Sequence, residues 1–337
     1  MRVPDRFVTM AHGGGGTRMQ ELLSEIVFPA LGSGEVAAAE DAACVDVPEG
    51  RLAFTTDSFV VSPLVFSGGD IGKLAVCGTV NDLAMVGAEP LYLTLGLILE
   101  EGLAFDVLEV ALASVARSAA EAGVEVVAGD TKVVEKGKAD GLYINTAGVG
   151  VVPRGVKISI TGAMPGDSLL INGFVGDHGV AVLKDRGAFA FDVAIDSDCA
   201  PLNALVADMV GAGSVHALRD PTRGGLAAAL KEMSVASGLA FEVDEEAIPV
   251  REGVRAVCEV LGLDPLYVAN EGKLLAAVPP DDADGVLEAM RASPYGRDAR
   301  LIGRAVDGKK GRVSLIGALG SSRLLRMPSG EQLPRIC

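Results

Sequence analysis

The pattern of apolar and polar residues along the chain predicts two successive rounds of strands and helices. Apolar positions that recur at i, i+3 and i+4 indicate helices, whereas β-branched runs with alternating polarity indicate strands. In the first round the pattern predicts a strand at Arg51–Val61, a helix at Gly69–Gly87, a strand at Tyr92–Leu99, a helix at Phe105–Ala122 and strands at Val124–Ala128 and Leu142–Val152. Such a mixture of strands and helices is typical of an α+β fold.

The second round begins after Pro153. It contains predicted strands at Ser168–Asn172 and Lys273–Val278 and predicted helices at Val180–Arg186, Leu202–Gly211, Pro221–Ser237, Val254–Leu261 and Ala283–Ala292. From Ser321 onward serine, glycine and proline occur without a period, which is typical of a mobile tail. We therefore expect an N-terminal domain over 1–155, a C-terminal α+β domain over 156–320 and a tail over 321–337.

Composition supports a folded protein of this size. A chain of 337 residues is long enough for two domains, and 49% apolar residues with 22% charged residues exclude an intrinsically disordered chain. A net charge of −16 disfavours a nucleic-acid partner. We find neither a signal peptide nor an apolar run near the roughly 18 residues of a membrane helix. The sequence thus predicts a cytoplasmic protein without a membrane partner.

The cysteines and histidines show no metal or nucleophile pattern. Neither a CxxC pair nor a cysteine–histidine cluster occurs, so we expect no disulfide and no structural zinc. Nothing supports a Ser-His-Asp or Cys-His system. The residues concerned are Cys44, Cys77, Cys199, Cys258 and Cys337, and His12, His178 and His216.

Four aspartates lie at positions that are typical of ligand-binding carboxylates. The helix at 69–87 is apolar on almost every side, so Asp82 near its end is expected to be buried, which is costly for an unpaired carboxylate. Asp57 lies near the end of a predicted strand, Asp130 follows another, and Asp41 precedes Ala42. Each alone is compatible with an ordinary turn or cap. Together they favour a Mg²⁺-nucleotide site, since oxygen ligands suit Mg²⁺ held with substrate phosphates.

Two glycine-rich segments are candidate phosphate sites. The run of Gly13, Gly14, Gly15 and Gly16 after His12 offers backbone N–H groups, although it lacks the GK[ST] ending of a Walker A loop and is equally compatible with a flexible N-terminus. In the second round, Asp220 is the expected N-cap of the helix that begins at Pro221, and Arg223 lies in its first turn. That helix start is either a phosphate site or simply a capped helix.

Cys337 is the last residue of the sequence and differs from the other cysteines. A tail of about 12 residues can reach roughly 40 Å at full extension, so the thiol can visit a site in its own protein or in a partner. The prenylation pattern does not fit, because its cysteine lies four residues from the end. A terminal cysteine without function remains the alternative at this point.

Seven segments, taken in order, resemble the HypE family of hydrogenase-maturation proteins, within the superfamily of aminoimidazole ribonucleotide synthetase and selenophosphate synthetase. They are TTDSFVVSPL (55–64), GGDIGKLAVCGTVNDLAMVGAEP (68–90), GDTKVV (129–134), GDHG (176–179), DPTRGGLA (220–227), NEGKL (270–274) and the terminal PRIC (334–337). One departure is Glu40 and Cys44 around Asp41, where the family pattern has Asp and an apolar residue. The superfamily motifs imply an ATP-dependent enzyme, and the terminal PRIC points to this member family.

The resemblance implies a two-domain synthetase fold of the aminoimidazole ribonucleotide synthetase type, with N-terminal domains that pair into a homodimer and bind ATP between them. It also implies the reaction. A carbamoyltransferase partner, HypF, places a carbamoyl group on the Cys337 sulfur. ATP-dependent dehydration then gives a thiocyanate, and the cyanide passes to a HypC–HypD complex for the iron of [NiFe]-hydrogenase.

The resemblance also suggests a role for each site residue. The expected metal ligands are Asp41, Asp57, Asp82 and Asp130. The expected nucleotide contacts are Gly13 to Gly16, Thr56, Lys73, Asn81 and Arg223. Lys132 is expected to neutralise the transferring phosphoryl group, and Glu271, or else His12, is expected to be the base that removes the nitrogen-bound proton.

Two other functions remain compatible with the sequence. One is a purine-pathway-like synthetase that acts on a diffusible amide and makes no use of Cys337. The other is a non-catalytic nucleotide-binding carrier that presents its tail to a partner.

Overall fold

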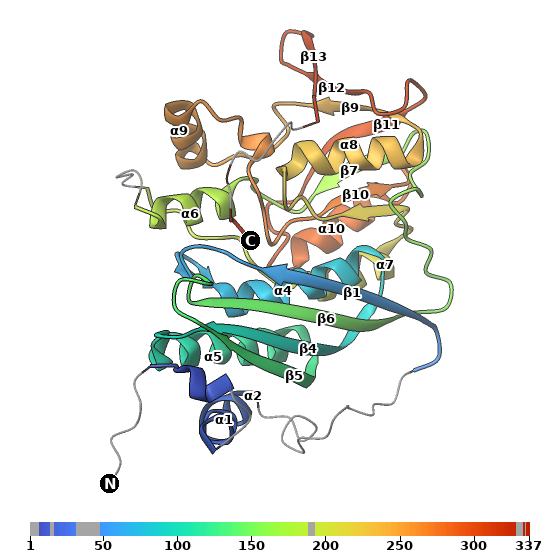
Figure 1. The fold of residues 1–337 in the computed structure, drawn as a ribbon. Helices are drawn as coiled ribbons and strands as arrows, with labels where there is room; N and C mark the ends of the chain where they lie inside the picture. Colours follow the sequence, from blue (N-terminus) through green and yellow to red (C-terminus); the bar gives the residue numbers. More distant parts are fainter. Residues whose placement is uncertain (1–6, 14–16, 32–47, 188–192, 328–332, 334) are drawn as a thin grey trace.

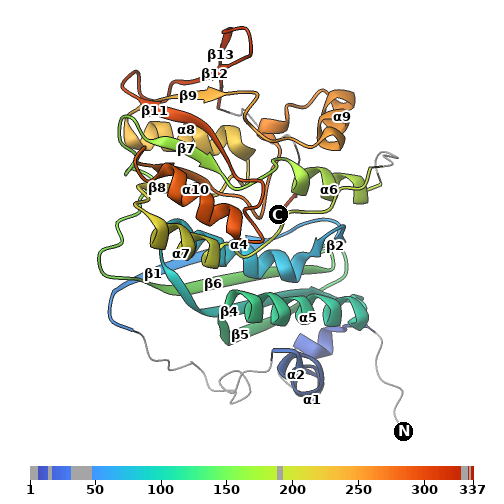
Figure 2. The same cartoon turned by 180° about the vertical axis from the view of Figure 1, so that it is seen from behind.

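The computed structural model describes residues 7–13, 17–31, 48–187, 193–327, 333 and 335–337. Two β-sheets lie one above the other in Figure 1, and each contains the strands of one of the two rounds. Helices fill the space between the sheets, and the C-terminus lies there as well, as the two opposite views in Figures 1 and 2 agree. The division of the chain at about residue 155 is compatible with this arrangement and stays a prediction.

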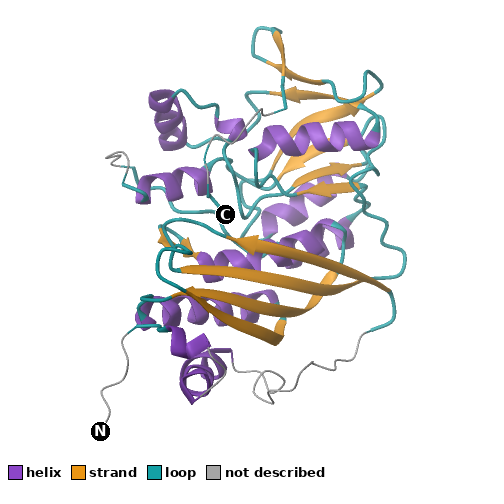
Figure 3. Ribbon diagram, viewed as in Figure 1, coloured by secondary structure: helices purple, strands orange, loops and turns teal. Residues whose placement is uncertain are grey.

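The first sheet has four strands in the order β1-β6-β4-β5, and only β4 and β5 run parallel. Helices α4 and α5 cover one of its faces, whereas no described helix covers the other face, which Figure 3 presents to the viewer. These elements are β1 (Arg51–Phe59), the hairpin strands β2 (Val65–Phe66) and β3 (Gly69–Asp70), α4 (Ile71–Met85), β4 (Glu89–Glu100), α5 (Phe105–Ala122), β5 (Glu125–Val134) and β6 (Leu142–Val152).

Helix α4 begins where the sequence allows its first turn to be capped. The Asp70 side chain accepts hydrogen bonds from the backbone N–H groups of Gly72 and Lys73. The helix is buried on almost every side, as its all-round apolar character predicts, because it is enclosed by the first sheet, α5 and α7. Four further elements pack near α5 at the N-terminus: η1 (Met10–Gly13), α1 (Thr17–Leu22), the π-helical η2 (Leu23–Val27) and α2 (Phe28–Leu31).

The second sheet has seven strands in the order β13-β12-β9-β11-β7-β10-β8. Helix α8 packs on one face, while α7 and α10 lie between this sheet and α4 (Figure 2). The elements are β7 (Ser168–Ile171), α6 (Asp177–Asp185), α7 (Asn203–Ala212), β8 (Ala217–Arg219), α8 (Gly225–Ser237), β9 (Ala240–Asp244), α9 (Glu252–Leu261), η3 (Pro265–Tyr267), β10 (Leu275–Val278), α10 (Ala283–Ala292), β11 (Arg300–Val306), β12 (Val313–Ile316) and β13 (Ser322–Leu324).

Two sequence predictions are wrong at glycines. The helix predicted from Pro221 begins only at Gly225, so Asp220 is not its N-cap, and Gly224 occupies that position with a left-handed backbone. A Cβ on Gly225 would lie 2.6 Å from the carbonyl oxygens of Leu266 and Val268, so a glycine is needed here because the protein's own backbone passes close by.

The strand predicted at Val124–Ala128 continues to Val134. Gly129 does not end the strand, because it lets β5 pass close to the Leu95 carbonyl oxygen of β4, 2.8 Å from where a Cβ would lie. Asp130 therefore lies within the strand rather than after it.

None of the helices that the structure describes combines the length and the apolar character that crossing a membrane requires. Cys77, Cys199 and Cys258 are free and buried, which confirms their expected place as small apolar residues, while Cys44 lies outside the described residues.

Candidate active site

The C-terminal residues lie alongside the segment that follows β1. The Val60 N–H donates to the Cys337 carbonyl oxygen over 3.2 Å, and the Ser62 N–H donates to the Arg335 carbonyl oxygen over 3.3 Å. Ile336 is only 4% exposed and belongs to the apolar core beneath the first sheet. The end of the chain is thus placed inside the molecule, between the two sheets.

The Cys337 thiol meets the guanidinium of Arg223. Arg223 Nη1 donates to Cys337 Sγ over 3.6 Å. Burial, and then the nearby Glu271 carboxyl group, raise the pKa of the thiol to about 12, although Arg223 acts in the opposite direction. A thiol with this pKa is protonated at neutral pH, so in the docked position Cys337 is a weak nucleophile.

Glu271 lies in the loop before β10, which begins at Leu275 rather than at Lys273 as expected. Its side chain is buried, and its Oε1 has no hydrogen-bond partner among the described residues. Burial, with Cys199 and Asp220 as the next causes, holds the pKa of Glu271 well above its ordinary value. A buried carboxyl group with a raised pKa beside the reactive sulfur has the properties of a general base or acid.

Asn81 fixes the loop that carries Glu271. Its Nδ2 donates to the carbonyl oxygens of Glu271 and Ala200, each over 3.1 Å, and its Oδ1 accepts from the Leu202 N–H over 2.8 Å. Because both amide protons are bound to backbone oxygens, the structure shows Asn81 holding the loop in place. The phosphate contact expected for Asn81 stays a prediction.

Three carboxylates gather near this loop. Thr55 Oγ1 donates to Asp82 Oδ2 over 2.8 Å, and Asp57 lies on the same face of β1 as Thr55, toward α4. Burial, then Asp220, raises the pKa of Asp82 to about 6, and Asp57 adds to the effect. Burial also raises the pKa of Asp220, with Asp57 among the lesser causes. From the sequence, Asp220 is expected only as a helix cap, although it lies in the same motif as Arg223.

The cluster of Asp57, Asp82 and Asp220 offers carboxylate oxygens of the kind that bind Mg²⁺. Like-charged carboxylates in a half-buried site repel one another, and a divalent cation would relieve that repulsion. Among the described residues, no group of three such ligands is close enough to hold a metal ion by itself. In many Mg²⁺ sites one or two carboxylates act together with substrate phosphates and water. Asp41, the fourth expected ligand, lies outside the described residues.

Asp130 and Lys132 are not brought to Cys337 within the chain. They pair with each other on β5, where Lys132 Nζ lies 2.5 Å from Asp130 Oδ2, and the lysine holds the pKa of Asp130 below its ordinary value. Both side chains are exposed on the uncovered face of the first sheet. Strand pairing places Asp130 beside Gly96, which is itself opposite Asn145.

Other predicted nucleotide contacts also lie apart from the cluster. Thr56 is exposed on the uncovered face of the sheet, the opposite side of β1 from Asp57, and donates to the Thr146 carbonyl oxygen. Lys73 Nζ donates to the Gly68 carbonyl oxygen over 3.0 Å and lines a cavity of about 470 Å³ that Cys199 also lines.

His12 and the glycine run belong to the N-terminal elements. His12 is buried, its ring packs edge-on against Phe105 at 5.3 Å, and its Nδ1 accepts from the Thr9 N–H. Gly13 ends η1, and Gly14 to Gly16 lie outside the described residues. His12 packs at the start of α5, whereas Cys337 contacts Val60 and Arg223.

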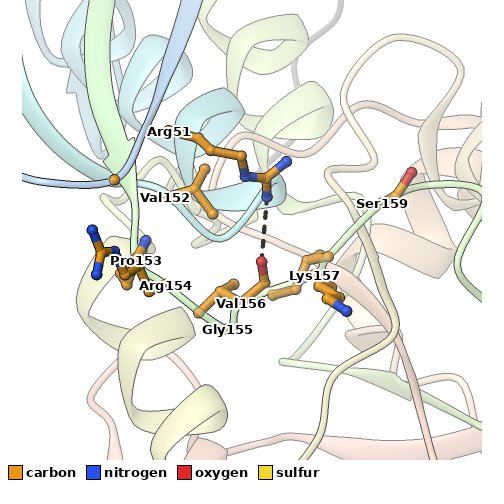
Figure 4. A pocket seen from close by; sticks show the side chains of 10 residues that line it. Arg51, Val152, Pro153, Arg154, Gly155, Val156, Lys157 and Ser159 are labelled. Carbon is orange, nitrogen blue, oxygen red and sulfur yellow. Dashed lines mark hydrogen bonds between the residues drawn. The ribbon is translucent and has the colours of Figure 1, made fainter.

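A second cavity, of about 650 Å³, lies where β6 ends (Figure 4). There Arg51 donates from Nη2 to the Val156 carbonyl oxygen over 3.2 Å, and Arg154 and Lys157 also line the space. None of the predicted site residues lines this cavity. The candidate active site is therefore the cluster around Cys337, namely Arg223, Glu271, Asp57, Asp82 and Asp220.

Comparisons with known proteins agree with this fold. The family models "AIR synthase related protein, N-terminal domain" and "C-terminal domain" match residues 39–152 and 164–316. The carbamoyl dehydratase HypE of Bradyrhizobium diazoefficiens is 53% identical over 332 residues, which are 98% of this chain and 96% of that protein. The chain belongs to the HypE carbamoyl dehydratase family.

Solved HypE structures match over nearly the whole chain. A HypE in complex with ATP has a TM-score of 0.94 at 46% identity and covers 98% of this chain and 99% of its own. The HypE of a HypE–HypF complex has a TM-score of 0.81 at 46% identity and covers 93% of this chain and 100% of its own. These findings confirm the resemblance, the α+β synthetase fold and the enzyme class that the sequence predicts.

Proposed function

We propose that this protein uses ATP to dehydrate an S-carbamoyl group on Cys337 to a thiocyanate, which supplies the cyanide ligand for the iron of [NiFe]-hydrogenase. The observation that carries the proposal is the position of the Cys337 sulfur, inside the molecule between Arg223 and the buried Glu271. Membership of the HypE family and the likeness to a HypE solved with ATP support it.

The reaction needs activation of an oxygen that is a poor leaving group. The carbamoyl oxygen attacks the γ-phosphate of ATP, which releases ADP and gives an S-linked imidate phosphate with loss of one nitrogen-bound proton. Loss of the second nitrogen-bound proton then expels phosphate and leaves S–C≡N. Phosphoryl transfer depends on positioning and charge neutralisation, whereas the elimination depends on a base.

Arg223 and Glu271 fit these two requirements. Arg223, already bound to the sulfur, is placed to neutralise charge on the carbamoyl oxygen as it becomes an imidate phosphate. Glu271 is close enough to Cys337 to raise its pKa, so its carboxylate would take the nitrogen-bound proton once ionised. Asn81 positions Glu271 through the backbone carbonyl oxygen.

Asp57 and Asp82 would hold Mg²⁺ together with the phosphates of ATP, with Asp41 as a further expected ligand. When bound, the ion would supply charge neutralisation for the phosphate oxygens. The raised pKa of Asp82 fits this role, since burial and the neighbouring Asp220 carboxyl group disfavour its charged form, which a bound cation would favour. Gly13 to Gly16, Thr56 and Lys73 remain the proposed nucleotide contacts.

We further infer a homodimer that forms through the uncovered face of the first sheet. Phe54 is 71% exposed on that face, and Leu52 and Ile98 on the same face are 49% and 40% exposed. Apolar side chains gathered on one face are typical of an interface. Asp130 and Lys132 lie on the same face. In a dimer formed there, these two residues would act at the partner subunit's site rather than at their own.

HypF is the expected carbamoyl donor, supported by the likeness to the HypE of a solved HypE–HypF complex, and a HypC–HypD complex is the expected cyanide acceptor. Since the docked thiol is protonated, loading of the carbamoyl group would occur with the tail outside the cleft. The cytoplasmic location expected from the sequence is consistent with these partners and stays a prediction.

Replacement of the terminal cysteine tests the proposal. Cys337→Ala should fold, dimerise and bind ATP as the native protein does, yet give no active [NiFe]-hydrogenase in a strain that has no other copy. Maturation that survives in this strain would overturn the proposal and leave a synthetase for a diffusible amide as the better reading. Maturation lost together with ATP binding would point to misfolding, so nucleotide binding is measured on the same preparation.

A further inference from the structure

Two side chains near the start and the end of α6 bind the main chain of the C-terminal residues. His178 Nε2 lies 2.8 Å from the Ile336 carbonyl oxygen, and Arg186 Nη2 donates to the Arg335 carbonyl oxygen. His178 belongs to the GDHG segment, and no role has been given to either residue above. Their contacts bracket the residue that precedes the reactive cysteine.

The hydrogen bonds around His178 determine which ring nitrogen carries the proton. A carbonyl oxygen only accepts, so Nε2 must be protonated to bind Ile336. On the other side of the ring, Ser197 Oγ accepts from the Cys199 N–H over 3.1 Å and donates its own proton to His178 Nδ1 over 2.8 Å. Burial holds the pKa of His178 below its ordinary value, which keeps the ring neutral. The ring is therefore a fixed donor aimed at the tail.

Arg186 joins the tail to the segment that it lies beside. Its Nε donates to the Ser62 carbonyl oxygen over 2.6 Å, while Nη2 donates to Arg335. The Ser62 N–H also donates to that Arg335 oxygen. One guanidinium thus spans two adjacent chain segments, which suits its planar, multiple-donor geometry.

We propose that His178 and Arg186 are positioning residues that hold the docked C-terminus by its backbone, so that the group on the Cys337 sulfur is presented to Arg223 and Glu271. This inference rests on the function proposed above. Because both residues bind carbonyl oxygens, a carbamoyl group on the sulfur leaves these contacts unchanged. The two residues therefore hold the loaded and the unloaded tail alike, and Arg223 contacts the reacting group.

The backbone of the tail at Arg335 opposes docking. Arg335 has a φ of 54°, a left-handed backbone that a residue with a Cβ adopts at a cost. Its side chain donates from Nε to the Val60 carbonyl oxygen over 3.1 Å and also contacts Asp140. The docked form is thus strained at one residue and depends on hydrogen bonds from its surroundings, which suits a tail that must also leave to reach its partners.

The test measures how fast iodoacetamide alkylates Cys337 in the full-length, ligand-free protein, by mass spectrometry of the C-terminal peptide. His178→Leu and Arg186→Met should each raise the rate by about tenfold, as expected for loss of a hydrogen bond worth roughly 1.4 kcal/mol. His178→Gln, whose amide nitrogen can replace Nε2, should restore most of the native protection. Arg304→Met is the matched control, because Arg304 pairs with Glu242 on the far part of the second sheet, and it should leave the rate unchanged.

A merely structural role predicts a different result. In that case the variants would lower thermal stability without changing the alkylation rate of the folded protein, and unchanged rates in His178→Leu and Arg186→Met would overturn the proposal. Should His178→Leu fail to fold, Ser197→Ala replaces it. Without the serine hydroxyl the ring proton is free to move to Nδ1, so faster alkylation is again expected and an unchanged rate again contradicts the proposal.

A second measurement separates this inference from the proposed function. Single-turnover dehydration of a tail that has already been carbamoylated should slow in His178→Leu and Arg186→Met and recover in His178→Gln. Native dehydration rates in variants with an exposed tail would overturn the positioning role. If the native protein itself fails to dehydrate the tail, the proposed function fails, whereas the alkylation result on tail docking still stands by itself.

Discussion

Arg223 and Cys337 are 114 positions apart in the chain, yet the arginine donates from Nη1 to the terminal sulfur over 3.6 Å. This contact joins the loop before α8 to the end of the tail. It places a permanent cation beside the sulfur on which we propose that the reaction takes place. The charge of Arg223 lowers the pKa of the thiol only in part, since burial and Glu271 act in the opposite direction.

The protonated state of the docked thiol gives a testable pH dependence. Burial raises the pKa of Cys337 to about 12, so the thiolate form is suppressed while the tail is docked. Between about pH 7 and 10, alkylation of Cys337 in the protein should therefore stay far slower than alkylation of a free peptide with the same last ten residues, whose thiol ionises near its ordinary pKa of about 8.5. Equal rates throughout this range would show that the thiol is not docked in solution.

Asp82 predicts a pH-dependent stability. Its folded-state pKa of about 6 exceeds the ordinary 3.8, so its contribution to folding is fully present below pH 3.8 and is lost as the pH rises through about 6. In the ligand-free state at pH 7, the free energy of unfolding of Asp82→Asn should therefore exceed that of the native protein by roughly 1 to 3 kcal/mol, and the variant should unfold at a higher temperature. At pH 4 the two proteins should differ little. Equal effects at the two pH values would contradict the burial of this carboxylate.

The same variant tests the metal site. Asp82→Asn should abolish Mg²⁺-dependent ATP hydrolysis while the fold is kept, since the amide is nearly isosteric with the carboxylate. Asp208→Asn, on α7, is a suitable control at a position outside the cluster. Unchanged turnover in Asp82→Asn would exclude Asp82 from the site.

Glu271→Gln separates proton transfer from nucleotide binding. If the carboxylate takes the nitrogen-bound proton, nitrile formation in a single turnover should fall by about 10² to 10⁴ while ATP still binds. Because the pKa of Glu271 is raised, the native rate should also increase with pH as the carboxyl group ionises, and the variant should lose this dependence. Loss of ATP binding instead would assign Glu271 to a contact with the nucleotide or the metal, and His12 would then be the candidate base.

The uncovered face of the first sheet predicts that activity requires two subunits. Phe54→Glu should give a monomer without ATP turnover, measured by light scattering and phosphate release.

Mixed dimers test whether Asp130 acts at the partner subunit's site. A mixture of Asp82→Asn and Asp130→Asn chains, each with native Phe54, should recover part of the activity, because each mixed dimer keeps one site with both aspartates intact. No recovery, with mixed dimers demonstrated, would show that Asp130 acts in its own subunit or not at all.

The sequence predicts the long, strongly periodic elements well. Helix α5 has the bounds expected from its apolar spacing, and β6 has those expected from its alternation. The pattern does not predict strands β9, β11 and β12. In β11 a register shift between Leu301 and Gly303 breaks the alternation. Gly129 resembles the end of a strand in the sequence, because its close packing against β4 has no local signature.

Asp57 and Arg223 could be predicted from their positions at a strand end and a helix start, and Glu271 from the family resemblance, whereas other site residues are recognised because their residue type is locally unusual. Asp82 in an apolar helix and Cys337 at the end of the chain are such cases, and the structure places both near Arg223 or its neighbours. His178 and Arg186 could not be identified, because their partners are backbone carbonyl groups about 150 positions away. A contact with the main chain of a distant segment leaves no pattern in the sequence.

The most direct test of dehydration on Cys337 is mass spectrometry of the C-terminal peptide after HypF has carbamoylated the protein. On addition of ATP and Mg²⁺, the carbamoylated peptide should lose the mass of one water molecule, with the change on Cys337 and with release of one phosphate for each tail converted. The same loss should be absent in Asp82→Asn. A carbamoylated tail that keeps its mass while ATP is hydrolysed, or one that loses water equally well in Asp82→Asn, would contradict dehydration at this protein's own ATP site.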